Sequence, residues 1–120
     1  MAQDISDAMV GLYKRYYGRG PTKARTHLAH DAIMCVLEEI FTTVERSLVE
    51  RGDHDTVAHV RGSFQRQFSG EFVRAVEEIT GRKVRAFLSE SHTDPDLAVE
   101  VFLLEPDIGS PQSEHEAVSR

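Results

Sequence analysis

The stretch DTVAHVRGSFQRQFSGEFVRAVEEIT, residues 55–80, decides the fold, because it is the longest periodic segment of the 120-residue chain. Its large apolar side chains recur every three or four positions, as on one face of an α-helix: Val57, Val60, Phe64, Phe68, Phe72, Ala75, Val76 and Ile79. Gly81 follows, in the position where many helices end. The pattern predicts a single helix about 40 Å long at 1.5 Å per residue.

A second row of mostly small side chains runs beside this stripe: Ala58, Gly62, Ser69 and Val73. The two rows cover more than half of the helix circumference, which is more than a helix lying on a sheet needs. Glycine inside a helix costs up to about 1 kcal/mol relative to alanine, so Gly62 and Gly70 require a physical reason. We favour the close approach of another backbone, with a simple kink as the alternative.

Upstream of the long helix, the sequence predicts one helix and two strands. Apolar residues at helical spacing indicate a helix over residues 5–17 that stops at Gly18. The segments 23–28 and 32–37 are rich in alternating or continuous apolar residues, and a polar turn separates them. The second segment is apolar on both faces, which is typical of an inner strand.

The remaining elements complete an α+β pattern. Thr42 and Glu45 have the spacing of a capping box, which predicts a short helix that ends at Gly52. Two further strands are expected over residues 83–89 and 97–104. The order is therefore α-ββ-αα-ββ, a four-stranded antiparallel or mixed sheet packed against one long and two shorter helices.

The two faces of this sheet cannot both be solvated. We expect the face toward the long helix to carry Ala24, Ile33, Cys35, Val99 and Val101. The reverse face would then carry Met34, Val36, Phe87 and Phe102. An apolar patch of this kind usually marks an interface. Together with Gly62 and Ser69 of the small-residue row, it predicts a homodimer, the commonest symmetric assembly.

The composition fits one globular domain, with 40% hydrophobic and 28% charged residues. The net charge is -6, but the last sixteen residues contribute four acids against one arginine, which leaves -3 for residues 1–104. That balance argues against a dedicated nucleic-acid binder. We expect a single domain over residues 1–106, followed by a disordered acidic tail over residues 107–120.

Cysteine usage and hydropathy indicate a cytoplasmic domain. Cys35 is the only cysteine, so an internal disulfide is excluded and a reducing compartment is the simpler interpretation. Its apolar surroundings favour a buried, inert thiol. The N-terminus lacks the apolar block of a signal peptide, and no uncharged run approaches the roughly 20 residues of a membrane span. Any membrane association would therefore depend on a partner protein.

The basic segment YYGRGPTKAR, residues 16–25, is the candidate binding site. It does not match a Walker phosphate loop, because its glycines are too close together and a helix precedes it. Arg19, Lys23 and Arg25, with Tyr16, could still converge on an anion or an acidic partner near exposed backbone N–H groups. The alternative is a helix cap and turn whose charges are simply solvated.

A nucleic-acid function is a further alternative. The element order is similar to that of the type II KH domain, an RNA-binding module. That module clamps RNA with a G-x-x-G loop between two helices. Here the corresponding turn, RGDHDT at residues 51–56, is acidic and lacks the second glycine, so it would repel phosphates.

Metal and catalytic patterns are weak. His92, Asp94 and Asp96 resemble a metal-ligand cluster, but three local ligands without a distant fourth are also ordinary turn residues. Glu100 lies in an apolar strand, where it is either an acid with a raised pKa or the partner of Arg25 or Arg85 across the sheet. We expect no cofactor, no catalytic residue and no enzymatic activity.

Three segments resemble a bacterial family: LYKRYYGRGPTKART, VLEEIFTTVERSLVERG and FVRAVEEITGRKVRAFLSESHTDPDLAVEVFLLEP. This family is the C component (MpsC-like) of the Na⁺-translocating membrane-potential-generating system, formerly a domain of unknown function. The resemblance covers about residues 5–106. Its most distinctive parts are Y-Y-G-[KR]-G-P at residues 16–21 and D-P-D before the last strand. One departure is EEIFTT at residues 38–43, where a glycine-containing turn is expected.

The resemblance implies a soluble cytoplasmic accessory domain associated with a membrane system for ion translocation, membrane potential and inorganic carbon supply. It implies no reaction, cofactor or catalytic residue. We therefore expect a non-enzymatic interaction or regulatory domain that forms a homodimer and contacts a membrane protein. The alternative is a sensor of small anions of the bicarbonate or phosphate class, and a KH-like nucleic-acid binder is less favoured.

Overall fold

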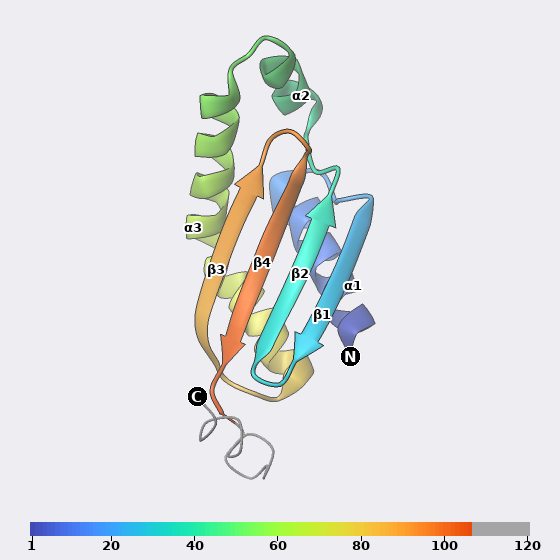
Figure 1. The fold of residues 1–120 in the computed structure, drawn as a ribbon, viewed down its shortest axis with the longest axis vertical. Coiled ribbons are helices and arrows are strands. Elements are labelled where there is room, and N and C mark those ends of the chain that lie inside the picture. The colour runs from blue at the N-terminus through green and yellow to red at the C-terminus, as the bar shows by residue number, and fades with distance from the viewer. Residues whose placement is uncertain (107–120) are drawn as a thin grey trace.

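The computed structural model describes residues 1–106 and confirms the predicted order of elements (Figure 1). The elements are α1 (Ala2–Leu12), a π-helical turn η1 (Tyr13–Tyr17), β1 (Lys23–Ala29), β2 (Ala32–Glu38), α2 (Thr43–Glu50), α3 (His54–Thr80), β3 (Val84–His92) and β4 (Leu97–Leu104). The tail expected over residues 107–120 lies outside the described residues. The fold is α+β, with α3 as its longest element.

The four strands form one antiparallel sheet in the order β1-β2-β4-β3. The two hairpins are therefore joined through their second strands, and β2 and β4 occupy the centre (Figure 1). The β2 and β4 segments are also the most apolar of the four. The mixed-sheet alternative is excluded for the described residues.

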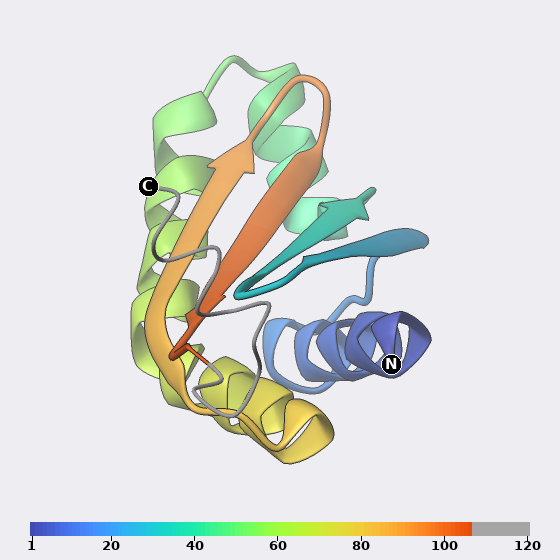
Figure 2. The same cartoon turned by 60° about the horizontal axis from the view of Figure 1, so that its bottom comes forward.

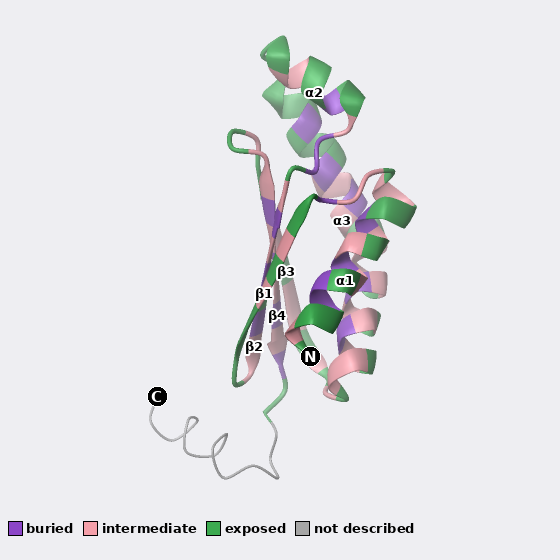
Figure 3. Ribbon diagram, turned by 90° about the vertical axis from the view of Figure 1, so that its right-hand side faces the viewer, coloured by how far each residue is buried: buried purple, intermediate pink, exposed green. Residues whose placement is uncertain are grey.

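Both α1 and α3 lie on the same face of the sheet, and the opposite face carries no helix of the described chain (Figures 2 and 3). The core between the two layers contains Ile5 and Met9 of α1, Phe72 and Val76 of α3, and the inward residues of β2 and β4. Phe72 stacks on Phe87, which in turn stacks on Phe102, at centroid separations of 5.9 and 4.8 Å. This aromatic column joins the long helix to the sheet.

The face assignment of the last two strands corrects one expectation. Phe102 is fully buried beneath the helices and Phe87 packs on the same core, whereas Val99 and Val101 point to the uncovered face. Both faces of β4 are apolar, so hydrophobicity does not decide which face turns inward. Ile33 and Cys35 do face the helices, as predicted, and Met34 lies on the uncovered face with 41% of its surface exposed.

The helix ends follow local sequence signals. The capping box at Thr42 is present, with the Thr42 side chain accepting from the Glu45 amide and the Glu45 side chain accepting from the Thr42 amide. Asp53 caps α3, and Gly81 ends it in the left-handed conformation. The first helix begins at Ala2, earlier than the expected Ile5.

Candidate functional site

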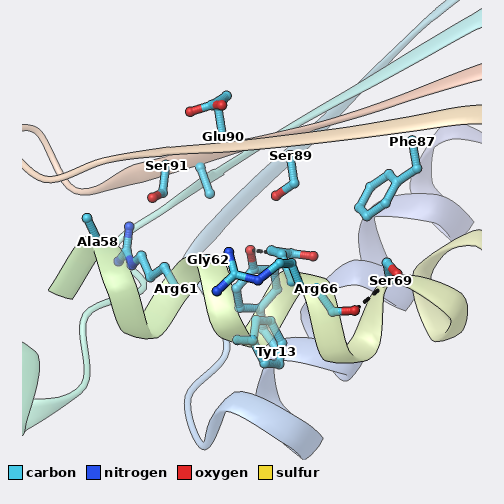
Figure 4. A pocket seen from close by; sticks show the side chains of 13 residues that line it. Tyr13, Ala58, Arg61, Gly62, Arg66, Ser69, Phe87, Ser89, Glu90 and Ser91 are labelled. Atoms are coloured by element: carbon cyan, nitrogen blue, oxygen red, sulfur yellow. Dashed lines mark hydrogen bonds between the residues drawn. The ribbon is translucent and has the colours of Figure 1, made fainter. Parts of the chain in front are cut away.

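A pocket of about 550 Å³ opens between α3 and β3 (Figure 4). From α3 it is lined by Ala58, Arg61, Gly62, Phe64, Gln65, Arg66 and Ser69, and from the sheet by Phe87, Ser89, Glu90, Ser91 and Ala98, with Tyr13 behind. The small side chains of α3 and the two serines of β3 leave this space between the layers unfilled. The pocket therefore lies along the small-residue row of the long helix.

The nearest neighbour of Gly62 is a side chain and not a second backbone. A Cβ at Gly62 would lie 3.1 Å from the Nη1 atom of Arg66, and only Arg66 atoms lie within 4 Å of it. The Arg66 guanidinium thus folds back over Gly62 into the pocket (Figure 4). A Cβ at Gly70 would meet nothing within 4 Å. Within the described chain, no other backbone approaches either glycine.

A buried polar cluster lies behind the pocket. The Tyr13 hydroxyl and the Gln65 amide both donate to Oε1 of Glu100, at 2.7 Å each, and the Gln65 amide also donates to the Tyr13 oxygen at 2.8 Å. Burial raises the pKa of Glu100 to about 7, against the lowering effect of hydrogen bonds from Tyr13 and Ser89. Glu100 is therefore an acid with a raised pKa, and its partners are Tyr13 and Gln65 in place of Arg25 or Arg85.

A second cluster ties the top of α3 to the loops. The Arg61 guanidinium is 4% exposed; it pairs with Asp96 at 2.7 Å and with Glu45 at 3.6 Å. Tyr17 donates a hydrogen bond to Glu45. Burial alone would lower the pKa of Arg61, but Asp96 raises it above the usual value. Arg61 thus stays charged and links α3 to Glu45 of α2 and to Asp96 in the turn before β4.

The predicted basic site is only partly assembled. Lys23 and Arg25 lie together with His27 on the uncovered face of β1, around a cleft of about 590 Å³ that also includes Glu38. Tyr16 instead stacks on Phe68 at 4.7 Å. The Arg19 Nε donates to the Glu39 carbonyl at 3.3 Å.

The weak metal candidates are engaged in turn contacts. Asp96 uses one carboxylate oxygen for Arg61 and the other for the Phe41 amide, and His92 Nδ1 contacts the Pro95 carbonyl. Within residues 1–106, no three His, Cys, Asp or Glu side chains are grouped to hold a metal.

Sequence reasoning did not single out Arg61, Gln65 or Arg66. The sequence does contain a signal for the first two. Arg61 follows Val57 by one helical turn and Gln65 follows Arg61 by another, so both lie at the edge of the apolar stripe. A polar residue there is expected to be buried and paired.

The uncovered sheet face, here called the outer face, has a simple transverse pattern. Its central strands present Met34 and Val36 from β2 and Val99 and Val101 from β4, and Leu88 of β3 is 53% exposed. One row across the sheet reads Arg25, Val36, Val99 and Glu90, as successive register partners. Glu90 points away from α3 (Figure 4).

The family of the chain follows from its match to a known family model. The chain belongs to the family described as Na⁺-translocating membrane potential-generating system (MpsC), whose model matches residues 1–106. Neither the curated proteins nor the solved structures include a match to it. No helix of the described part of the chain is long and apolar enough to cross a membrane.

Proposed function

We propose that this chain is a non-enzymatic accessory domain of the membrane-potential system named by its family, and that it acts as a homodimer. The observation that supports the proposal is the outer face, an apolar sheet surface on which no described helix packs. Met34 and Leu88 are 41% and 53% exposed there. Of the interface residues expected from sequence, Met34 and Val36 lie on this face, whereas Phe87 and Phe102 are in the core, and Gly62 and Ser69 line the pocket.

Charge complementarity favours a second copy as the occupant. A twofold axis parallel to the central strands would place β1 of one copy over β3 of the other, in the face-to-face packing common to sheets. The row containing Arg25 and Glu90 then faces the same row of the second copy, which runs in the opposite direction across the sheet. Each Arg25 faces a Glu90 of the second copy, and the valines between them pack together.

The proposal that the domain is non-enzymatic rests on its reactive side chains. Cys35 is fully buried, and burial raises the pKa of its thiol to about 11, so the nucleophilic thiolate is scarce at neutral pH. Glu100 is enclosed as well.

A charge-exchange experiment tests the dimer. Arg25→Glu and Glu90→Arg should each weaken self-association in light scattering, because each creates two like-charge pairs. Mixing the two variants should restore a heterodimer, because every pair is then of opposite charge. Arg46→Glu, on exposed α2, is the control and should leave association unchanged. A wild-type chain that stays monomeric at all concentrations would refute the dimer.

Reconstitution tests the accessory role. Vesicles containing the membrane proteins of the system should generate a different Na⁺-dependent potential when the chain is added. Val99→Lys, which places a charge in the centre of the outer face, should reduce that effect. The same potential with and without the chain, and no co-sedimentation with the vesicles, would reject the role.

A further inference from the structure

We propose that the pocket between α3 and β3 binds a small oxyanion that carries a proton of its own, of the hydrogen phosphate class. The site consists of the Arg66 guanidinium, the Ser91 hydroxyl and the Oε1 atom of Gln65, with Ser69 and Ser89 beside them. Glu90 of the outer-face row is also among the lining residues, whereas the basic row of β1 is not.

Arg66 supplies the positive charge. Within residues 1–106, no carboxylate lies at ion-pair distance from its guanidinium. Arg66 is an exposed residue, and its guanidinium folds back over Gly62 along the pocket. The other lining arginine, Arg61, is already neutralised by Asp96 and Glu45. The charge available to a ligand is therefore that of Arg66.

Ser91 supplies a neutral donor beside this charge, since the Ser69 hydroxyl donates to the Arg66 carbonyl at 3.5 Å and Ser89 is hydrogen-bonded to Glu100. Ser89 and Ser91 alternate along β3 and point toward α3, facing Arg66 across the pocket (Figure 4). Ser69 lies one turn further along α3 from Gln65 and Arg66. A guanidinium beside a serine hydroxyl supplies donors suited to an oxyanion.

Gln65 supplies the one acceptor that selects among oxyanions. The Gln65 Nε2 atom donates hydrogen bonds to the Tyr13 hydroxyl oxygen and to the Glu100 carboxylate. This orientation of the amide is favoured because an ionised carboxylate can only accept hydrogen bonds. Its Oε1 is buried and has no hydrogen-bond partner among the described residues. A buried acceptor without a donor is costly. The hydroxyl of a protonated oxyanion can provide that donor, whereas sulfate has none at neutral pH.

The volume leaves room for more than an inorganic ion. About 550 Å³ lies in the range of small-molecule sites, roughly 300–1,000 Å³. Inorganic phosphate keeps a proton at neutral pH, whereas a phosphomonoester, with a second pKa of about 6, is mainly the dianion without one. Calorimetric titrations with inorganic phosphate, glycerol phosphate and sulfate at equal ionic strength therefore test the role of that proton, and inorganic phosphate should bind tightest.

The expected result is millimolar or tighter binding of a phosphate form, at least about tenfold tighter than sulfate, since a site that hydrogen-bonds a hydroxyl rejects analogues without one. Arg66→Ala should weaken that binding about tenfold or more. Arg74→Ala, an exposed arginine on the same helix, is the control and should have no effect. Equal affinity for sulfate, no binding at millimolar phosphate, or unchanged binding by Arg66→Ala would each overturn the proposal.

Two alanine substitutions separate the site from helix stability. Gly62→Ala would put a methyl group 3.1 Å from Arg66 Nη1 and displace the guanidinium, so phosphate binding should weaken severalfold although the helix gains alanine. Gly70→Ala meets nothing and should leave binding unchanged. Both variants are expected to fold. Equal phosphate affinity in the two variants would contradict the role of Arg66.

Discussion

Tyr13 and Glu100 are 87 positions apart, yet the Tyr13 hydroxyl donates a hydrogen bond of 2.7 Å to the Glu100 carboxylate. This contact crosses both layers, because it links the π-helical turn after α1 to a central strand. It also explains how a carboxylate can occupy a fully buried position in β4. The stability of the domain should therefore depend on the protonation of Glu100.

The first prediction concerns pH. Burial raises the pKa of Glu100 from 4.5 to about 7 in the folded chain. Between these values the folded chain retains a proton that the unfolded chain has lost, so the free energy of unfolding should fall as pH rises through this window. The loss is at most about 3 kcal/mol. Urea unfolding at about pH 5 and about pH 8 should show it, and Glu100→Gln should remove most of this difference. An equal pH dependence in the variant would contradict the assignment.

Tyr13→Phe should destabilise the domain by about 1–3 kcal/mol, because Glu100 loses a donor inside the core. It should also raise the pKa of Glu100 further, since the Tyr13 hydrogen bond lowers it. Tyr16→Phe is the matched control: its ring stacks on Phe68, and that contact does not depend on the hydroxyl. Equal losses in the two variants, measured by thermal or urea unfolding, would refute the role of the Tyr13 hydroxyl.

Arg61→Met should cost about 3–5 kcal/mol, because it leaves Asp96 and Glu45 without their cation in a buried setting. Adding Asp96→Asn should recover part of the loss, since the unpaired charge is removed. Arg74→Met breaks an exposed pair with Glu71 and should change stability by no more than about 1 kcal/mol. A similar effect of the two arginine substitutions would show that Arg61 does not act as a buried link.

Glu39→Gly should stabilise the domain by about 1 kcal/mol. Glu39 has a φ of 62°, in the left-handed region that glycine adopts at lower cost. It stands in EEIFTT, the segment where a glycine-containing turn was expected. Glu38→Gly, in the last position of β2, is the control and should destabilise. A lower thermal midpoint for Glu39→Gly would show that its side chain contributes more than the backbone strain costs.

Much of the fold follows from local patterns. The stripe from Val57 to Ile79 predicts α3, the Thr42 capping box predicts α2, and the last strand is found at its expected bounds. These features depend on neighbours within a few positions, so they can be deduced from the chain alone. The candidate pocket could not be deduced in this way, because its residues come from α3, β3, β4 and η1.

The amino-acid sequence by itself determined the helices and strands, their order and the family. Only the tertiary structure decided which face of β4 turns inward, because both sets of its side chains are apolar apart from Glu100. That choice depends on Tyr13 and Gln65, which are distant in sequence and donate hydrogen bonds to the buried Glu100 carboxylate. With Glu100 facing inward, Val99 and Val101 lie on the outer face. Local periodicity shows which side chains of a strand share a face. The hydrogen-bond partners of a buried carboxylate, in contrast, depend on how the helices pack on the sheet.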